Sequence, residues 1–244
     1  MAIDPVILEP IADRAWPARE RSRLGGWRLN ATSGWSMRSN ACWPLEEPDR
    51  EVEAALDATE AWFGTRGLPP RFKLTEGATA PADLPQRLAR RGYQACKQTL
   101  VLTGRTAGQP DAAVRLSDRP DAGFEAVFAA SAAGNLADAR ERLETLARIP
   151  APARFASLDL GGATAALGAC AVEGQWVGLF GMRTAPEQRR KGLARRVFAT
   201  LLAEAAQLGA SHAYLQVEAD NAPALALYGS EGFQPAYAYQ YWVL

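Results

Sequence analysis

A basic tripeptide and a glycine stand between an expected strand and an expected helix. The segment GMRTAPEQRRKGLA (residues 181–194) places Arg189, Arg190 and Lys191 directly before Gly192. The first N–H groups of a helix have no partners within the helix, and its dipole adds about half a positive charge at that end. Cations are disfavoured there unless an anion compensates them, so the segment predicts a phosphate site for which a pyrophosphate is the natural ligand. The plainer alternative is an exposed, solvated helix start.

The motif in this segment is neither of the two common glycine loops, because G-x-x-x-x-G-K-[ST] and G-x-G-x-x-G do not occur. Instead R-x-x-G-x-A (Arg189, Gly192, Ala194) resembles the [QR]-x-x-G-x-[GA] motif of the GNAT superfamily of N-acyltransferases. Further along, NAPALALYGSEGF (residues 221–233) resembles the N-x-x-A-x-x-x-Y-x-x-x-G-F signature of the same superfamily. The two motifs occur in the superfamily's order and spacing, and the resemblance covers residues 112–244.

The resemblance implies an acetyl-CoA site between two strands that splay apart, with the pantetheine arm hydrogen-bonded to main-chain groups. By matching position, Met182, Arg183 and Thr184 would offer main-chain groups to pantetheine. Asn221 matches the asparagine that contacts the cofactor arm, and Tyr228 matches the tyrosine near the thioester sulfur. The pyrophosphate would be held by Arg189, Arg190, Lys191, Gly192, Leu193 and Ala194.

Acetyl transfer to an amine needs both a base and an acid. An alkyl ammonium has a pKa of about 10, so a base, often acting through water, removes a proton before the amine attacks the thioester. The leaving thiolate needs a proton, which the Tyr228 hydroxyl suits, while N–H groups of the splayed strand polarise the thioester carbonyl. A half-buried aromatic ring beside Leu225 and Leu227 is the plain alternative for Tyr228.

The general base is where this chain departs from the superfamily. The enzymes that acetylate ribosomal proteins carry a glutamate where this chain has Gln216, and other members carry one where it has Gly178. Glutamine cannot accept the proton, so Glu218, two residues on and on the same strand face, is the nearest substitute. Two alternatives stay open: a base from the N-terminal half, or an amine that arrives already neutral.

The order of elements over residues 112–244 fits the same superfamily. Strands are expected over residues 113–116, 154–160, 163–172, 175–182, 212–217 and 233–243, and helices over 121–131, 137–149, 191–208 and 222–228. Gly161-Gly162 predicts a tight hairpin turn between two of the strands. We therefore expect an α+β fold with a mixed, mostly antiparallel GNAT-type sheet flanked by helices.

The N-terminal half echoes this order. Helices are expected over residues 49–66 and 82–91, strands over 71–74 and 93–102, and a hairpin of strands 27–32 and 35–42. Helix, glycine, strand, short helix and Gly-aromatic follow one another in both halves, with 25 residues from Gly67 to Gly92 and 23 from Gly209 to Gly232. The echo predicts a degenerate GNAT-like domain (residues 1–105), a linker (residues 103–111) and a catalytic GNAT domain (residues 112–244), although chance similarity is the alternative.

Five of the seven tryptophans lie in the N-terminal half: Trp16, Trp27, Trp35, Trp43 and Trp62. They could form one wall of an acceptor pocket, with Arg38 or Asn40 facing the cleft. Packing between the two halves explains them equally well. The N-terminal half has no [QR]-x-x-G-x-[GA] loop between helix and strand, so we expect only the C-terminal half to bind CoA.

Composition limits the partners. Lys and Arg together number 27, as do Asp and Glu, which leaves no surplus of cations for nucleic acid. No apolar run approaches the roughly 18 residues of a membrane span, and the first residues lack a secretion signal. Three cysteines without a C-x-x-C pair and the single His212 argue for a reduced protein without a metal centre. We expect a cytoplasmic protein that contacts neither nucleic acid nor membrane, and its oligomeric state stays open.

These observations predict an N-acetyltransferase that moves an acetyl group from acetyl-CoA to a primary amine by direct attack on the thioester. The acceptor would be a small molecule or a peptide. One alternative is a non-catalytic acyl-CoA-binding sensor or scaffold, which the glutamine at position 216 motivates. Another is a protein N-terminal or lysine acetyltransferase whose N-terminal half docks the partner.

Overall fold

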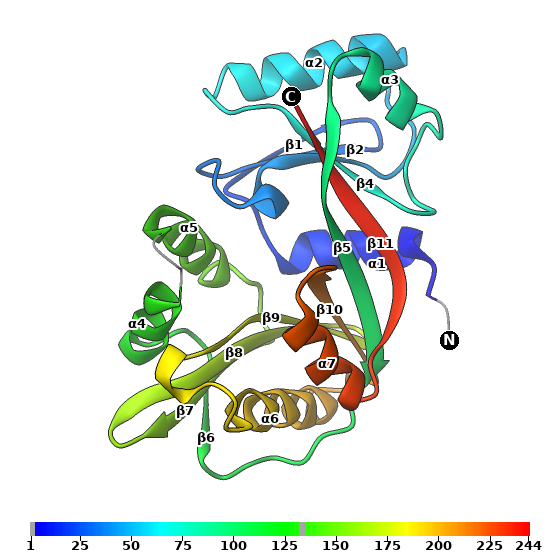
Figure 1. Ribbon diagram of the computed structural model, residues 1–244. Helices are drawn as coiled ribbons and strands as arrows, with labels where there is room; N and C mark the ends of the chain where they lie inside the picture. The colour runs from blue at the N-terminus through cyan, green and yellow to red at the C-terminus, as the bar shows by residue number, and fades with distance from the viewer. Residues whose placement is uncertain (1–2, 132–134) are drawn as a thin grey trace.

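A computed structural model describes residues 3–131 and 135–244, and its strands form a single sheet. The sheet has eleven strands in the order β1-β2-β3-β4-β11-β5-β10-β9-β8-β7-β6 (Figure 1). The strands are β1 (Glu20–Leu24), β2 (Trp27–Ala31), β3 (Ala41–Pro44), β4 (Arg71–Thr75), β5 (Gln94–Arg105), β6 (Val114–Ser117), β7 (Ala153–Leu160), β8 (Ala163–Glu173), β9 (Trp176–Thr184), β10 (His212–Glu218) and β11 (Gln234–Val243). Only β3 with β4 and β9 with β10 pair in parallel among the described residues, so the sheet is mixed and mostly antiparallel, as expected.

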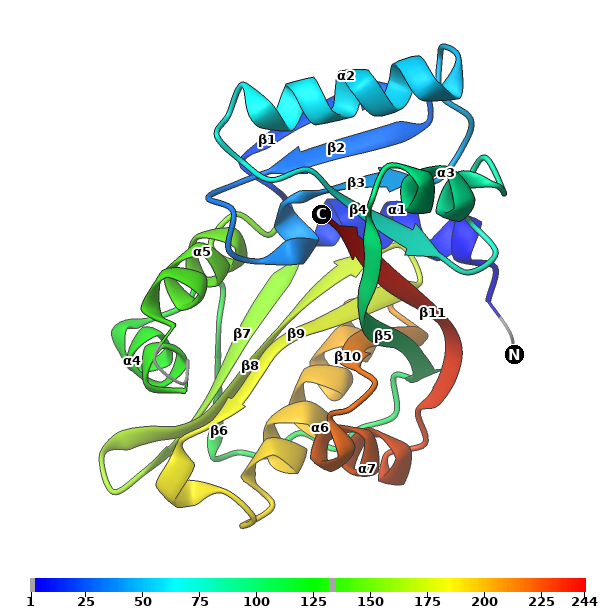
Figure 2. The same ribbon diagram turned by 45° about the horizontal axis from the view of Figure 1, so that its top comes forward.

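Helices flank the sheet on both faces (Figure 2). They are α1 (Pro5–Ala15), α2 (Val52–Gly64), α3 (Leu84–Arg90), α4 (Ala122–Ala130), α5 (Leu136–Leu146), α6 (Leu193–Gln207) and α7 (Ala222–Ser230), with short 3-10 turns η1 (Met37–Ser39) and η2 (Pro186–Gln188). Val197 of α6 and Tyr228 of α7 share one hydrophobic cluster, whereas Leu8 of α1 and Phe124 of α4 belong to another. The two clusters lie on opposite faces because successive residues of a strand point to opposite sides. None of the helices in the described residues is long and apolar enough to cross a membrane.

The C-terminal half follows the expected elements within a few residues. The β7–β8 hairpin turns at Gly161-Gly162, whose φ angles of 60° and 82° lie in the left-handed region that a tight hairpin requires. The long amphipathic helix is α6, and the strand before it, β9, runs on to Thr184. Local periodicity was sufficient here because each of these elements buries one side against a neighbour close in sequence.

The N-terminal half departs from the expected elements in its first part only, because α2, α3, β4 and β5 lie where helices and strands were expected. The sequence pattern predicts neither α1 nor β1, and the observed tight hairpin joins β1 to β2 at Gly25-Gly26. The expected turn at Ser33-Gly34 is wrong: β2 does pair with β3, but through a loop over residues 32–40 that contains η1. The amides of this loop are satisfied by the side chains of Asn40 and Glu141 instead of by strand partners.

The two halves exchange their last strands. β5 ends the N-terminal half but lies between β10 and β11, and β11 ends the described chain but lies between β4 and β5. These pairings are antiparallel, with Leu100 opposite Val217 and Lys73 opposite Tyr241. Because one continuous sheet runs through both halves, the division into domains over residues 1–105 and 112–244 stays a prediction.

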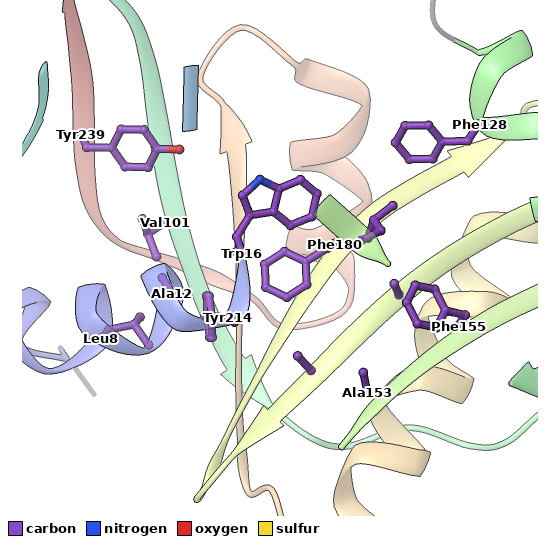
Figure 3. Close-up of a cluster of buried hydrophobic side chains, with 14 of the residues drawn as sticks. Leu8, Ala12, Trp16, Val101, Phe128, Ala153, Phe155, Phe180, Tyr214 and Tyr239 are labelled. Carbon is purple, nitrogen blue, oxygen red and sulfur yellow. The ribbon is translucent and has the colours of Figure 1, made fainter. Parts of the chain in front are cut away.

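Aromatic packing holds the end of α1 and the turn η1 against strand β9 of the sheet. Figure 3 shows Trp16 beside Phe180, with ring centroids 5.4 Å apart, and the indole N–H donates to Ser39 Oγ at 3.0 Å. A fully buried ion pair between Glu9 of α1 and Lys73 of β4 fixes the helix further. Packing is thus the better account of the buried tryptophans Trp16, Trp27 and Trp43.

Candidate active site

Two neighbouring strands part in the middle of the C-terminal half. β9 and β10 pair from Trp176 and His212 as far as Leu179 and Leu215, after which both strands continue without pairing to each other. The cause lies in β9, where the register against β8 shifts by one residue at Gly181, whose φ is 63°. A bulge of this kind bends the strand and increases its twist. The parting therefore leaves a free main-chain edge on β9 over Met182, Arg183 and Thr184, as the resemblance implied.

The N-terminus of α6 follows this free edge directly. Gly192, the residue before the helix, has a φ of 75°, and a Cβ added there would meet nothing within 4 Å. The amide groups of Leu193, Ala194 and Arg195 have no hydrogen-bond acceptor among residues 3–131 and 135–244, and no acidic residue lies in the first turn. This helix start is exposed main chain with room for a ligand oxygen.

Three cations surround that helix start. Arg189, Arg190 and Lys191 are exposed, and none of them forms an ion pair with any described residue. Arg190 has a φ of 62°, a left-handed conformation that costs a residue with a side chain roughly 1–3 kcal/mol. Strained backbone and uncompensated charge at a positive helix end are both explained if an anion is the partner.

In the N-terminal half, α2 is the counterpart of α6. It connects the parallel strands β3 and β4, as α6 connects the parallel strands β9 and β10. Its preceding residue is Glu51, and Glu53 lies in its first turn. These carboxylates complement the helix dipole without a ligand and would repel a phosphate. The charge pattern supports the expectation that CoA binds only in the C-terminal half.

Tyr228 lies on the α6 side of the sheet. Its side chain is buried, and its ring packs on Phe198 of α6 with centroids 5.3 Å apart. Burial raises the pKa of the hydroxyl to about 12, against the opposing effect of the positive charge on Arg183. The helix that carries Tyr228 is capped by Asn221, whose Oδ1 accepts from the Ala224 amide at 3.2 Å. Asn221 therefore has a structural role in addition to the cofactor contact expected for it.

The residues of the free β9 edge point to both faces. Met182 packs with the α6 cluster, whereas the Arg183 guanidinium lies on the opposite face, 4.9 Å from the ring centroid of Phe128. Burial lowers the pKa of Arg183, and the neighbouring charge of Arg142 lowers it further. No carboxylate among the described residues forms an ion pair with Arg183, whose Nη1 donates to the Met182 carbonyl at 2.9 Å.

The candidate base and the candidate acid lie on opposite faces of the sheet. Glu218 is exposed at the end of β10 and shares the face of Gln216. Gln216 Oε1 accepts a hydrogen bond from the Tyr239 hydroxyl at 3.0 Å, and its Nε2 is buried without a partner in the described residues. Gly178 has no room for a side chain, since a Cβ there would lie 2.6 Å from the Tyr214 hydroxyl oxygen.

Sequence reasoning named Arg38 as a cleft residue but missed the tyrosines of β11 that lie beside it. Arg38 is half-buried, with its guanidinium 5.5 Å from the Trp16 ring centroid. Burial lowers the pKa of Arg38, but the neighbouring Tyr239 and Tyr241 of β11 raise it by more. Asn40, the other expected cleft residue, is buried and holds the loop instead. The alternation Tyr237-x-Tyr239-x-Tyr241 signalled one aromatic strand face. No local pattern placed that face beside Arg38.

Comparisons with known proteins agree with this architecture. Residues 6–242 match the family described as "Probable histone acetyltransferase Rv0428c C-terminal". The chain is 26% identical over 244 residues to the uncharacterized N-acetyltransferase YobR of Bacillus subtilis, covering 96% of both proteins. It is 31% identical over 216 residues to the probable histone acetyltransferase Rv0428c of Mycobacterium tuberculosis, covering 86% of this chain but 65% of that protein.

Solved structures show the same fold at lower sequence identity. A GCN5-related N-acetyltransferase from Kribbella flavida superimposes with a TM-score of 0.72 at 19% identity, over 100% of this chain and 96% of the other. A tandem GNAT protein from the clavulanic acid biosynthesis pathway gives a TM-score of 0.63 at 13% identity, covering 89% of this chain and 78% of the other. The chain belongs to the Rv0428c C-terminal family and is an acetyltransferase of the GNAT superfamily.

Proposed function

We propose that this protein is an N-acetyltransferase that moves an acetyl group from acetyl-CoA to a primary amine by direct attack on the thioester. The observation that carries the proposal is the parting of β9 from β10 immediately before the cationic, uncapped start of α6. A free strand edge suits the amide-rich pantetheine arm, and a positive helix start suits the pyrophosphate.

The proposed cofactor contacts follow from this arrangement. Main-chain groups of Met182, Arg183 and Thr184 would hydrogen-bond to pantetheine, and the side-chain N–H groups of Asn221 remain available to the same arm. The open space at Gly192 and the unpaired amides of the first turn fit a pyrophosphate. Its proposed ligands are the side chains or amides of Arg189, Arg190, Lys191, Gly192, Leu193 and Ala194.

The proposed reaction begins when the neutral amine attacks the thioester carbonyl carbon from the face opposite α6 and α7. The C–N bond forms, and the C–S bond breaks as the tetrahedral intermediate collapses. The thiolate takes the proton of Tyr228, which burial keeps neutral and available. The proton that the amine loses passes to Glu218, directly or through water, because the Gln216 side chain cannot accept it.

A second candidate function is a non-catalytic acyl-CoA sensor. The observation that favours it is the neutral Gln216, which accepts a hydrogen bond from Tyr239 at the position where the enzymes that acetylate ribosomal proteins carry a glutamate. A third is acetylation of a protein amine, which is supported by the similarity to the mycobacterial protein described as a probable histone acetyltransferase. Of the three candidate functions, only acetyl transfer to a small amine and acetylation of a protein amine release CoA when an acceptor is added.

A thiol-release assay separates these functions. Acetyl-CoA is incubated with the protein and with amines, amino acids, polyamines, aminoglycosides or peptides, and free CoA is measured. Release with one acceptor class supports acetyl transfer. Tight acetyl-CoA binding by calorimetry with no release against any acceptor overturns the proposal in favour of the sensor.

A further inference from the structure

The acceptor must approach the thioester from the sheet face that α6 and α7 leave free. We call this surface the acceptor face; it comprises Arg38, Arg183, Gln216, Tyr239 and Tyr241. These residues come from η1, β9, β10 and β11, and Figure 3 shows Tyr239 on the same side of the sheet as Trp16, Phe180 and Phe128. The location rests on the proposed function, since it assumes that the thioester lies between β9 and β10.

The acceptor face carries two guanidinium groups without counterions. Arg38 and Arg183 are both half-buried, and neither forms an ion pair with a carboxylate in the described ranges. Both guanidinium groups lie over rings of one hydrophobic cluster, Arg38 at 5.5 Å from the Trp16 ring centroid and Arg183 at 4.9 Å from the Phe128 ring centroid. Contacts with aromatic rings leave the positive charges of both groups unneutralised, and a guanidinium is well suited to binding a carboxylate or phosphate.

The nearby acids are already occupied. Asp138 accepts from Arg142 Nε at 2.7 Å, and Glu141 accepts from three loop amides and from Asn40 at 2.8 to 3.0 Å. The Gln216 Nε2 group adds a buried donor that has no acceptor in the part of the chain that the structure describes. The face therefore presents donors and positive charge, with Glu218 at the end of β10 as its exposed carboxylate.

We propose that the acceptor is an amine that also carries an anionic group, a carboxylate or a phosphate, which Arg38 and Arg183 bind while its amine faces Glu218 and the thioester. A lysine-rich peptide would instead bring further cations to two uncompensated arginines. The proposal thus distinguishes a small zwitterionic acceptor from a basic protein tail.

Matched amine pairs that differ in charge test this substrate class. An ω-amino acid is compared with its primary amide, O-phosphoethanolamine with ethanolamine, and both pairs with a lysine-rich peptide, by CoA release. We expect kcat/KM for the anionic member of at least one pair to exceed that of its neutral partner by tenfold or more, roughly the effect of one charged hydrogen bond. The pair with the larger ratio identifies carboxylate or phosphate. Equal use within both pairs, or preference for the peptide, overturns the proposal.

Variants locate the preference. Arg38→Gln should abolish the preference, that is, the ratio of kcat/KM for the anionic amine to that for its neutral partner, by raising KM for the anionic amine. Arg38→Lys should keep part of this preference. The control is Arg50→Gln, at an exposed arginine of the N-terminal half, which should leave the preference unchanged. Thermal unfolding of each variant verifies that it folds. A ratio that survives in Arg38→Gln overturns the assignment.

A binding measurement keeps this inference separate from the proposed function. The protein saturated with CoA is titrated calorimetrically with the same pairs. If no acceptor releases CoA, the proposed function fails, yet tighter binding of the anionic members still supports the anion site. If CoA release occurs without any anion preference in rate or binding, the function stands and this inference fails.

Discussion

The carboxylate of Glu141 accepts a hydrogen bond from the side-chain amide of Asn40 at 2.8 Å, although 101 residues separate the two. The same carboxylate accepts from the amides of Ser33, Trp35 and Ser36. One acid on α5 thus organises the loop of the N-terminal half that carries Arg38. The orientation of a proposed acceptor residue depends on a residue from the other half of the chain.

Replacing Glu141 with alanine should therefore destabilise the protein and impair the acceptor site. Four buried or half-buried donors lose their acceptor, and we expect the free energy of unfolding to fall by roughly 2–4 kcal/mol in urea titrations. Glu144→Ala on the same helix is the control, because its contacts with Arg19 and Arg140 are surface ion pairs worth about 1 kcal/mol or less. Equal losses in the two variants would contradict the anchoring role. Affinity for CoA should be unchanged in both.

Removing two of the loop cations should weaken cofactor binding selectively. In Arg189→Ala with Arg190→Ala, we expect the Kd for CoA to rise by about 10- to 100-fold, because charge-assisted bonds to the pyrophosphate are lost. The charge-matched control is Arg50→Ala with Arg119→Ala, two exposed arginines elsewhere on the surface. Calorimetry measures both. Unchanged affinity in the first variant would remove α6 from the cofactor site.

Tyr228→Phe should reduce turnover while leaving CoA bound. We expect kcat to fall by roughly 100-fold, as for other positioned proton donors, with a Kd for CoA within about twofold of the original. The pKa of about 12 also makes a prediction about pH, because a phenol donates its proton only below its pKa. The unmodified enzyme should show no loss of kcat with a tyrosine-like pKa near 10. A decline at that pH which disappears in Tyr228→Phe would argue against the raised pKa.

Asp111 should make stability depend on pH at the acid end of the range. Hydrogen bonds from Arg196 and from the Ala113 amide lower its pKa to about 2, compared with about 3.9 in an unfolded chain. The carboxylate therefore stabilises the folded state fully above about pH 4, and this contribution disappears as the pH falls through about 2. Asp111→Asn should flatten the stability curve between these values in urea titrations, and Arg196→Gln should do the same. A curve of unchanged slope in both variants would show that the pair does not form in solution.

Sequence and structure agree best where elements pack on close neighbours in the chain. The periodicity around Val197 and the two glycines at 161–162 were sufficient for α6 and for the β7–β8 hairpin. The parting of β9 and β10 was expected only through the resemblance, since the shift in register at Gly181 has no signature in composition.

The N-terminal half was harder because its loops are completed by distant residues. The loop after β2 looked like a tight turn, yet its amides bind Asn40 and a glutamate from α5. Likewise, no local pattern shows that Tyr239 lies beside Gln216. That contact depends on which strand stands next to which, and strand order is not encoded in the period of either segment.

The exchanged strands also impose an order on biosynthesis. A ribosome releases residues in sequence, so β4 emerges long before β11, the neighbour that covers one of its edges. Until β11 has left the exit tunnel, that edge offers unsatisfied amides and carbonyls to any other extended chain. A polypeptide that ends shortly before β11 would thus keep the facing edges of β4 and β5 unpaired, and chaperones that bind extended chains would recognise them.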